Sequence, residues 1–356
     1  MNAAANESLL GRVRGCLLGG AVGDALGAPV EFLSLEEIRR RFGTAGVVGM
    51  AEGVRPAGSI TDDTQMTLFT ADGLLRADVR GASKGICHVP TVVDHAYTRW
   101  LLTQGEVSRR WEGREADGWL IRVPELHARR SPGLTCLSAL AGARMGTVAE
   151  PLNDSKGCGG VMRIAPVGLT GARERAFSTG VELAALTHGH PSGYLSAGFM
   201  AAVVAALREE APLESALDQA TAELTHRQEH DETLAAIRAA RALAAQGSPS
   251  PERVQTLGSG WVGEEALAIA LYAVLTTRSF REAVLVAVNH GGDSDSTGAI
   301  AGNMAGVLYG EDAIPAEWLD QLELRETITQ IAEDLYRCHV RGDWDPEREW
   351  ERYPGW

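Results

Sequence analysis

The sequence of 356 residues contains only five cysteines, and no two of them form a C-x-x-C pair. This spacing argues against a zinc ribbon and against a disulfide scaffold, and it suits a reducing cytosol. The N-terminus lacks a basic segment followed by an apolar core, so no signal peptide is expected. The longest apolar stretch, residues 16–30, contains Asp24 and is shorter than the roughly 20 residues of a membrane span. We therefore predict a cytoplasmic protein that does not enter a membrane.

Basic residues are also scarce, since 33 lysines and arginines stand against 47 aspartates and glutamates and give a formal net charge of −14. This excess of negative charge argues against nucleic acid and against an anionic membrane surface as partners. An anionic ligand stays compatible with it, because a bound divalent metal reverses the field locally. With 45% hydrophobic residues, the chain has enough apolar side chains for a large core.

Alternation of period two, which is typical of strands, is missing apart from a few short runs. Helical spacing recurs along most of the chain, and no change of composition marks a domain boundary. We predict an all-α fold, a single compact multi-helix domain over residues 1–356. Its core blocks are expected at 9–310 and its C-terminal helices at 315–340, with a loop at 78–90 and a long irregular excursion at 104–132.

Glycine is plentiful instead, and it recurs at every fourth position in two segments. The first set is Gly15, Gly19, Gly23 and Gly27, and the second is Gly298, Gly302, Gly306 and Gly310. Each set gives a predicted helix one face without side chains, which lets another backbone come unusually close. Glycine costs about 1 kcal/mol relative to alanine inside a helix, so packing or a ligand must compensate. We predict that the two helices pack against each other at the centre of the molecule.

Two acidic clusters occur where loop becomes helix. The first contains Thr61, Asp62 and Asp63, and the second contains Asp293, Asp295 and Ser296. Carboxylate and hydroxyl oxygens suit Mg²⁺, Mn²⁺ or Ca²⁺ and do not suit zinc. Four gathered carboxylates would repel one another, and two divalent ions about 3.5–4 Å apart would compensate. In the alternative interpretation each cluster only caps a helix N-terminus, and the residues alone leave both interpretations open.

Further candidates for a site each have a plain structural alternative. The glycine-rich loop at 155–160 (SKGCGG) exposes backbone N–H groups that suit a phosphate, or it is simply a tight turn. Arg163 either neutralises a phosphate or caps a neighbouring helix. His188 either contacts a ligand or makes a structural hydrogen bond. Glu31 stands in an apolar turn, where a carboxylate is either paired with a cation or used for proton transfer.

Five blocks of sequence resemble, in order, the signature blocks of the ADP-ribosylglycohydrolase family. They read GCLLGGAVGDALGAPVEF, GSITDDTQMTL, NDSKGCGGVMRIAP, LTHGHPSGYLSA and NHGGDSDSTGAIAGNMAG. The blocks run from residue 15 to about residue 310 and therefore cover nearly the whole chain. The resemblance is to the type that includes the dinitrogenase-reductase-activating glycohydrolase.

This resemblance implies an all-α globule with a binuclear magnesium centre in a central cleft. The implied metal ligands are Thr61, Asp62, Asp63, Asp293, Asp295 and Ser296. The implied catalytic residues are Glu31 and Asp62, and the implied substrate contacts are Ser155, Gly157, Cys158, Gly159, His188 and, on the adenine side, Trp261. Two positions depart from the family pattern, since Cys158 stands where Asn is common and Ser155 where the nitrogenase-related branch has Asp. The second departure favours Glu31 as the group that handles the proton.

The resulting hypothesis is a Mg²⁺-dependent hydrolase, with Mn²⁺ or Ca²⁺ as substitute ions. It would cleave the bond between C1″ of ADP-ribose and an acceptor, an arginine or serine side chain. The expected partner is an ADP-ribosylated protein or a small ADP-ribose conjugate, and the protein is expected to be a monomer.

Two rival hypotheses lead to different functions. A member that binds ADP-ribose, or is crystallin-like, would have lost the chemistry, but all four aspartates and Glu31 are present. A phosphotransferase of the haloacid-dehalogenase type would fit D-x-D-x-T at residues 293–297. Residues 290–292 separate that motif from the preceding apolar run, and too little chain follows it for that fold.

Overall fold

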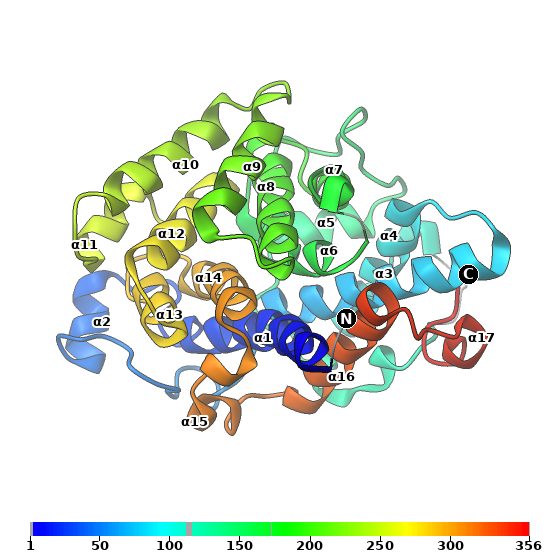
Figure 1. The fold of residues 1–356 in the computed structure, drawn as a ribbon, viewed down its shortest axis with the longest axis horizontal. Coiled ribbons are helices and arrows are strands. Elements are labelled where there is room, and N and C mark those ends of the chain that lie inside the picture. The colour runs from blue at the N-terminus through cyan, green and yellow to red at the C-terminus, as the bar shows by residue number, and fades with distance from the viewer. Residues whose placement is uncertain (1–2, 112–115, 172, 356) are drawn as a thin grey trace.

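The two glycine-striped segments form helices that lie side by side through the centre of the molecule (Figure 1). The computed structural model describes residues 3–111, 116–171 and 173–355. In it, helix α1 spans Ala3–Gly27 and helix α14 spans Ser294–Tyr309.

Backbone meets backbone along this contact. The facing pairs are Gly15 with Gly306, Gly19 with Gly302, and Gly23 with Gly298. A Cβ atom built on Gly15 or Gly19 would lie 2.5 Å from the carbonyl oxygen of its partner, which is far inside van der Waals contact. The order of the pairs makes the helices antiparallel, and the predicted packing is confirmed.

The other elements are short to medium helices joined by turns. In chain order the α-helices are α2 (Leu35–Phe42), α3 (Asp62–Lys84), α4 (Val89–Thr103), α5 (Leu134–Ala141), α6 (Ala165–Leu169), α7 (Arg173–Ala185), α8 (Pro191–Arg208), α9 (Leu213–Thr225), α10 (Asp231–Ala244), α11 (Pro251–Val254), α12 (Gly263–Thr276), α13 (Phe280–Val288), α15 (Ala316–Leu319), α16 (Arg325–Tyr336) and α17 (Pro346–Glu349). No strand occurs in the described ranges, and their one isolated β-bridge joins Gly157 to Val262. The all-α prediction is therefore confirmed.

The helices surround the central pair and form one compact domain (Figure 1). Helix α8 is buried along nearly its whole length, because its residues are apolar or small on every face. Helices α12 and α13 pack on α14, whereas α3 and α16 pack on α1. Among the described helices, none is both long and apolar enough to cross a membrane.

The loop expected at 78–90 is largely helix, so this part of the prediction is wrong. Helix α3 continues to Lys84, and α4 begins only a few residues later at Val89. The buried guanidinium of Arg76 lies 2.9 Å from the carboxylate of Asp72 one turn earlier and stabilises the helix interior. The helix ends at Gly85, whose φ of +72° favours glycine and whose N–H donates to the carbonyl of Gly81.

The excursion at 104–132 is irregular in its described part, as predicted, and residues 112–115 lie outside the described residues. It contains three short 3₁₀ turns, η1 (Arg109–Trp111), η2 (Leu120–Arg122) and η3 (Pro124–His127). Further such turns are η4 (Cys158–Gly160), η5 (Gln255–Leu257) and η6 (Glu311–Ala313), and η7 (Arg337–Arg341) is a π-turn.

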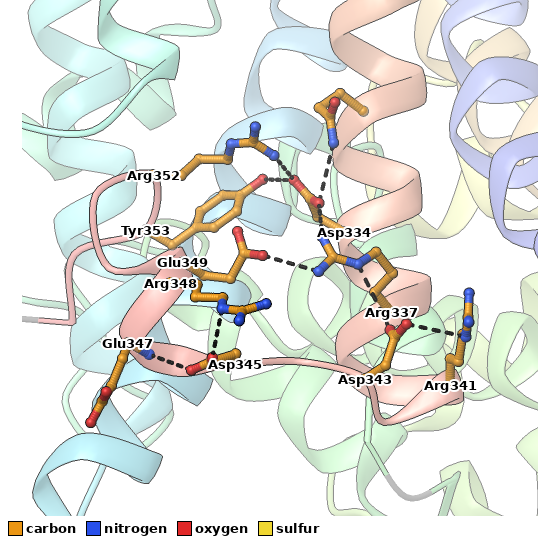
Figure 2. A network of polar contacts seen from close by, with 11 residues as sticks. Asp334, Arg337, Arg341, Asp343, Asp345, Glu347, Arg348, Glu349, Arg352 and Tyr353 are labelled. Atoms are coloured by element: carbon orange, nitrogen blue, oxygen red, sulfur yellow. Dashed lines mark hydrogen bonds and ion pairs between the residues drawn. The ribbon is translucent and has the colours of Figure 1, made fainter.

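The C-terminal segment is held by a polar network around Asp334 on α16 (Figure 2). This buried carboxylate accepts hydrogen bonds from Tyr353 (2.7 Å), Arg352 (3.0 Å) and Arg337 (3.4 Å). Because a buried carboxylate is costly without such partners, the network fixes the residues after α16 against the body of the molecule.

The central contact yields a stability prediction. Gly23→Ala adds a methyl group that would overlap the carbonyl of Gly298, so we expect the free energy of unfolding to fall by about 1–3 kcal/mol. Gly11→Ala is the matched control in the same helix, because a Cβ atom there meets nothing within 4 Å. The control should gain about 0.5–1 kcal/mol from helix propensity. Urea unfolding of both variants measures this, and equal effects would contradict the packing argument.

Candidate active site

The two acidic clusters predicted from the sequence are brought to one place by the central helix pair. Thr61 caps the N-terminus of α3, and its side chain accepts from the N–H of Asp63 (3.3 Å). Asp293 caps the N-terminus of α14 and accepts from the N–H of Ser296 (3.4 Å). Each cluster therefore does cap a helix, as the structural alternative proposed. Capping does not explain Asp62, Asp63 and Asp295, which are also buried.

The carboxylates lie close enough to interact strongly. Oxygen atoms of Glu31, Asp293 and Asp295 all lie within 4.8 Å of one another. Burial, and next the charge of Asp295, raises the pKa of Asp62 and of Asp63 well above its usual range. The pKa of Asp293 is raised in the same way. In the described part of the chain, no lysine or arginine forms an ion pair with any of the four aspartates.

These residues fit a pair of hard divalent cations. The donors are carboxylate and hydroxyl oxygens, which such cations prefer. Oδ1 of Asp63 is buried and has no hydrogen-bond partner among the described residues. An orphaned buried oxygen among mutually repelling carboxylates needs a positive partner, and a divalent ion supplies one.

Asp24 orders the first cluster, and the sequence interpretation missed it. Its fully buried carboxylate accepts from the backbone N–H groups of Thr61 (3.0 Å) and Thr64 (3.2 Å) and from the Thr64 hydroxyl (2.5 Å). Burial, and next the charge of Asp295, raises the pKa of Asp24 to about 7. Asp24 thus fixes the start of α3 against α1. The one available signal was a carboxylate inside an apolar, glycine-striped helix.

Glu31 lies at the border between the carboxylates and an open pocket. Burial, and next Asp295 and Asp293, raises the pKa of Glu31 to about 10, while Arg55 acts in the opposite direction. The pocket has a volume of about 560 Å³ and is lined by Glu31, Phe32, Val54 and Arg55, among others. Glu31 therefore faces both the acidic cluster and a space large enough for a second group.

The loop at 155–160 is held in shape on the opposite side. The N–H of Cys158 donates to the carbonyl of Trp261 (3.2 Å), and the N–H of Gly263 donates to that of Lys156 (2.7 Å). The Ser155 hydroxyl accepts from the N–H of Gly157 (3.3 Å) and so supports its own loop. The Lys156 ammonium pairs with two glutamates, one of them Glu264 at 2.6 Å. Its charge is thereby directed away from any ligand of the loop.

Cys158 points its side chain at the second acidic cluster. Its Sγ lies 2.8 Å from Oδ2 of Asp293 and 3.6 Å from the hydroxyl of Ser296. Burial and the charge of Asp293 raise the pKa of the thiol well above its usual range, so it donates as a neutral group. The backbone of Cys158 belongs to the loop, whereas its side chain lies among the carboxylates.

Arg163 and Thr187 determine how His188 presents its ring. The buried guanidinium of Arg163 donates to the Thr187 hydroxyl (2.6 Å), which lies 2.8 Å from Nδ1 of His188. The hydroxyl has two acceptors in reach, the carbonyl of Ala184 at 3.5 Å and Nδ1 at 2.8 Å, and the shorter contact together with the nearby guanidinium charge favours donation to Nδ1. The proton of the neutral ring is then at Nε2. Burial, and next Arg163, lowers the pKa of His188 to about 3, so the ring stays neutral.

The Nε2–H group of His188 faces the glycines of the loop at 155–160. A Cβ atom on Gly157 would lie 3.3 Å from Nε2 of His188, and one on Gly159 would lie 3.2 Å from it. Side chains at these positions would fill the space next to the ring, so the glycines keep it open. Arg163 acts through Thr187 and does not itself reach the loop. The sequence interpretation offered a phosphate or a helix cap for it and missed this role.

Comparison with known proteins identifies the family. The model of the ADP-ribosylglycohydrolase family matches residues 5–343. The chain belongs to this family. Its members are glycosidic-bond hydrolases, and this protein is an enzyme of that class.

Relatives with named activities cover almost the same length. The ADP-ribosylarginine hydrolase Tri1 of Pseudomonas putida is 31% identical over 93% of this chain and 79% of its own. The ADP-ribosyl-[dinitrogen reductase] glycohydrolase of Rhodospirillum rubrum is 28% identical over 88% of this chain and 91% of its own. A solved ADP-ribosylglycohydrolase-related protein complex superposes with a TM-score of 0.64 at 27% identity, covering 93% of this chain and 99% of that one.

In this family member Trp261 lies at the edge of the site, directly after Gly260, where a Cβ atom would meet Thr297 and Asp293. Its indole stacks on Phe32, with ring centroids 5.1 Å apart and an angle of 22° between the planes. The side chain is half-exposed and next to the β-bridge residue Val262. Direct contacts therefore connect the acidic clusters, the loop, His188 and Trp261 in one region, while their individual roles stay predictions.

A second group of potential ligands lies elsewhere in this ADP-ribosylglycohydrolase. Asp78, Cys338 and His339 come within 4.8 Å of one another. Nδ1 of His339 accepts from the N–H of Gly171 (3.4 Å). Its Nε2 lies 2.8 Å from the carboxylate of Asp78 but has no aligned hydrogen-bond partner among the described residues.

The hydrogen bonds that connect Arg163, Thr187 and His188 yield a spectroscopic prediction. We expect ¹⁵N NMR to show the His188 ring neutral and protonated at Nε2, with no titration between pH 5 and 8. Since the unfolded His takes up a proton near pH 6.5 and the folded one only near 3, this group lowers stability as pH falls through that window. Thr187→Val should mix the tautomers, while Thr187→Ser keeps one. A ring protonated at Nδ1 in the unaltered protein would refute the assignment.

Proposed function

We propose that this enzyme hydrolyses the glycosidic bond between C1″ of ADP-ribose and an acceptor, an arginine or serine side chain of a protein. The observation that carries the proposal is the meeting of Glu31 with four buried aspartates, next to a glycine loop shaped for an anion. The names of Tri1 and of the dinitrogen reductase glycohydrolase support the same chemistry. A cytoplasmic monomer would be consistent with it.

Two Mg²⁺ ions would be held by the two acidic clusters, with Mn²⁺ or Ca²⁺ as substitutes. The ligands would be Thr61, Asp62, Asp63, Asp293, Asp295 and Ser296. When bound, such ions supply a clamp for ribose hydroxyls and a water, and they stabilise charge as the bond to C1″ loosens. Asp24 would keep the first three ligands in position through its hydrogen bonds to the start of α3.

Glu31 would move the proton. It stands between the ligand cluster and the open pocket, so that a water at the cluster and a leaving acceptor in the pocket would both come within its reach. Its raised pKa shows an environment that favours the protonated acid, and bound cations would shift the balance toward the carboxylate. Asp62 would contribute to catalysis by holding a cation and water.

The loop and His188 would bind the diphosphate and the distal ribose. The backbone N–H of Gly159, together with the Nε2–H of His188, would donate to oxygens without carrying net charge, whereas the N–H of Gly157 already donates to the Ser155 hydroxyl and holds the loop in shape. Ser155 and Cys158 would shape the loop, and Trp261 would line the adenine side. A member without catalysis would not need the carboxylates, so no observation favours the binding-only alternative.

Removal of single carboxylates tests the proposal. Asp62→Asn and Asp295→Asn should each lower hydrolysis of ADP-ribosylated arginine or serine peptides at least about a thousandfold, a loss that fits removal of an electrostatic group from the transition state. The helical circular dichroism should stay unchanged. Asp231→Asn, at an exposed position on α10, is the control and should keep full activity. Full activity of either site variant would contradict the proposed centre.

Removal of the metal gives an independent test. Excess EDTA should abolish hydrolysis, and Mg²⁺ or Mn²⁺ should restore it. Calorimetric titration of the stripped protein should show binding that Asp63→Asn weakens, because that carboxylate carries the orphaned oxygen. Undiminished hydrolysis in EDTA would exclude a metal-dependent reaction.

A further inference from the structure

A cluster of three different ligand types lies near the C-terminal end of α3. Asp78, Cys338 and His339 offer an oxygen, a sulfur and a nitrogen atom that all lie within 4.8 Å of one another. Asp78 stands on the same helix as Asp62, about 24 Å further along its axis at the usual rise per residue. The cluster is therefore separate from the acidic clusters of the candidate active site.

The nitrogen and the oxygen of this cluster lie close together without forming a good hydrogen bond. Nε2 of His339 is 2.8 Å from the carboxylate of Asp78, yet it has no aligned hydrogen-bond partner among the described residues. In a hydrogen bond the oxygen would lie in line with the N–H bond. Two ligands of one metal ion instead lie beside each other, because each directs its lone pair at the ion. The observed arrangement is of the second kind.

Burial makes the unpartnered nitrogen significant. The His339 side chain is only 10% exposed and Nε2 itself is buried, so bulk water does not replace the missing partner. The Asp78 side chain is 41% exposed, which gives an ion a route to the cluster. Nitrogen and oxygen ligands of a tetrahedral zinc ion stand about 3.3 Å apart, so the Asp78 carboxylate would move back by about half an ångström.

The three donors select a different metal from that expected at the acidic clusters. Sulfur and imidazole nitrogen, joined by one carboxylate oxygen, suit Zn²⁺, whereas Mg²⁺ and Ca²⁺ prefer oxygen alone. Burial, and next the charge of Asp78, raises the pKa of the Cys338 thiol, so the thiol stays protonated until a cation displaces the proton. A zinc ion with one thiolate and one carboxylate forms a neutral unit, which suits a partly buried position.

The local backbone brings the two C-terminal donors to the same side. Cys338 and His339 are neighbours in the π-turn η7, a rare geometry that is frequent at functional sites. Nδ1 of His339 faces the N–H of Gly171 at 3.4 Å. Zinc at Nε2 requires the ring proton on Nδ1, so this long contact would be given up when the metal binds.

We propose that Asp78, Cys338 and His339 bind a zinc ion, with a water molecule as the fourth ligand. On binding, the sulfur, the nitrogen and the oxygen each form a bond to zinc. The Cys338 thiol releases its proton to solvent, and the His339 ring proton moves from Nε2 to Nδ1 by exchange with solvent. Bound zinc joins the end of α3 to the segment that follows α16.

Cobalt(II) tests the sulfur ligand directly, because a thiolate bound to it gives a charge-transfer absorption band that oxygen ligands do not give. Untagged protein, stripped with EDTA and saturated with Mg²⁺, is titrated with Co²⁺ and then with Zn²⁺. We expect this band to appear with Co²⁺ and to vanish as Zn²⁺ replaces it. Cys338→Ser should lose the band. Cys158→Ser is the matched control, a thiol beside Asp293, and should keep it.

Calorimetry with Zn²⁺ in excess Mg²⁺ tests the other two ligands. His339→Gln and Asp78→Asn should each weaken zinc binding at least about tenfold, with the helical circular dichroism unchanged. These two variants also keep the inference testable if Cys338→Ser disturbs the C-terminal segment. Absence of the band in the unaltered protein would overturn the proposal. A band that only Cys158→Ser removes, or a zinc affinity that neither of the other variants changes, would overturn it as well.

Discussion

The close approach of α1 and α14 is the constraint on which the site depends. With glycine facing glycine along the contact, the two backbones hold a fixed register that side chains would not permit. Helix α1 carries Asp24, which holds the start of α3, and α14 begins at Asp293. The contact therefore positions both acidic clusters at once, although more than 200 residues separate them in sequence.

The clusters are placed where backbone dipoles partly offset their charge. Asp62 and Asp63 lie in the first turn of α3, and Asp295 lies in the first turn of α14. A helix N-terminus stabilises a nearby carboxylate by about 0.3–1 kcal/mol at exposed positions, somewhat more when partly buried. This stabilisation is small compared with the free-energy cost of burying several carboxylates in contact with one another. The fold therefore holds carboxylates whose mutual repulsion is relieved by added positive charge, which the two divalent ions of the proposed centre would supply.

Much of the fold and of the candidate site could be predicted because the sequence patterns that encode them are local or periodic. The glycine spacing predicted the central helix contact, and the Thr61–Asp63 and Asp293–Ser296 patterns predicted helix starts with oxygen donors. Asp24 was missed because its hydrogen bonds reach residues almost forty positions away. The end of α3 was misplaced although Ala77, Arg80 and Ala82 are good helix formers, and the helix continues until Gly85 ends it. Which side chains meet across the cleft depends on tertiary packing that no periodicity encodes.

The neutral ring of His188 and the paired charge of Lys156 have one electrostatic explanation. In the proposed centre, bound cations would already attract the diphosphate, so further fixed charge at the loop would tighten substrate and product alike. Lys156 is accordingly paired with glutamates, and Arg163 is buried behind Thr187, where it orients a neutral donor. Positive charge is thus kept away from the loop that would hold the common part of every substrate.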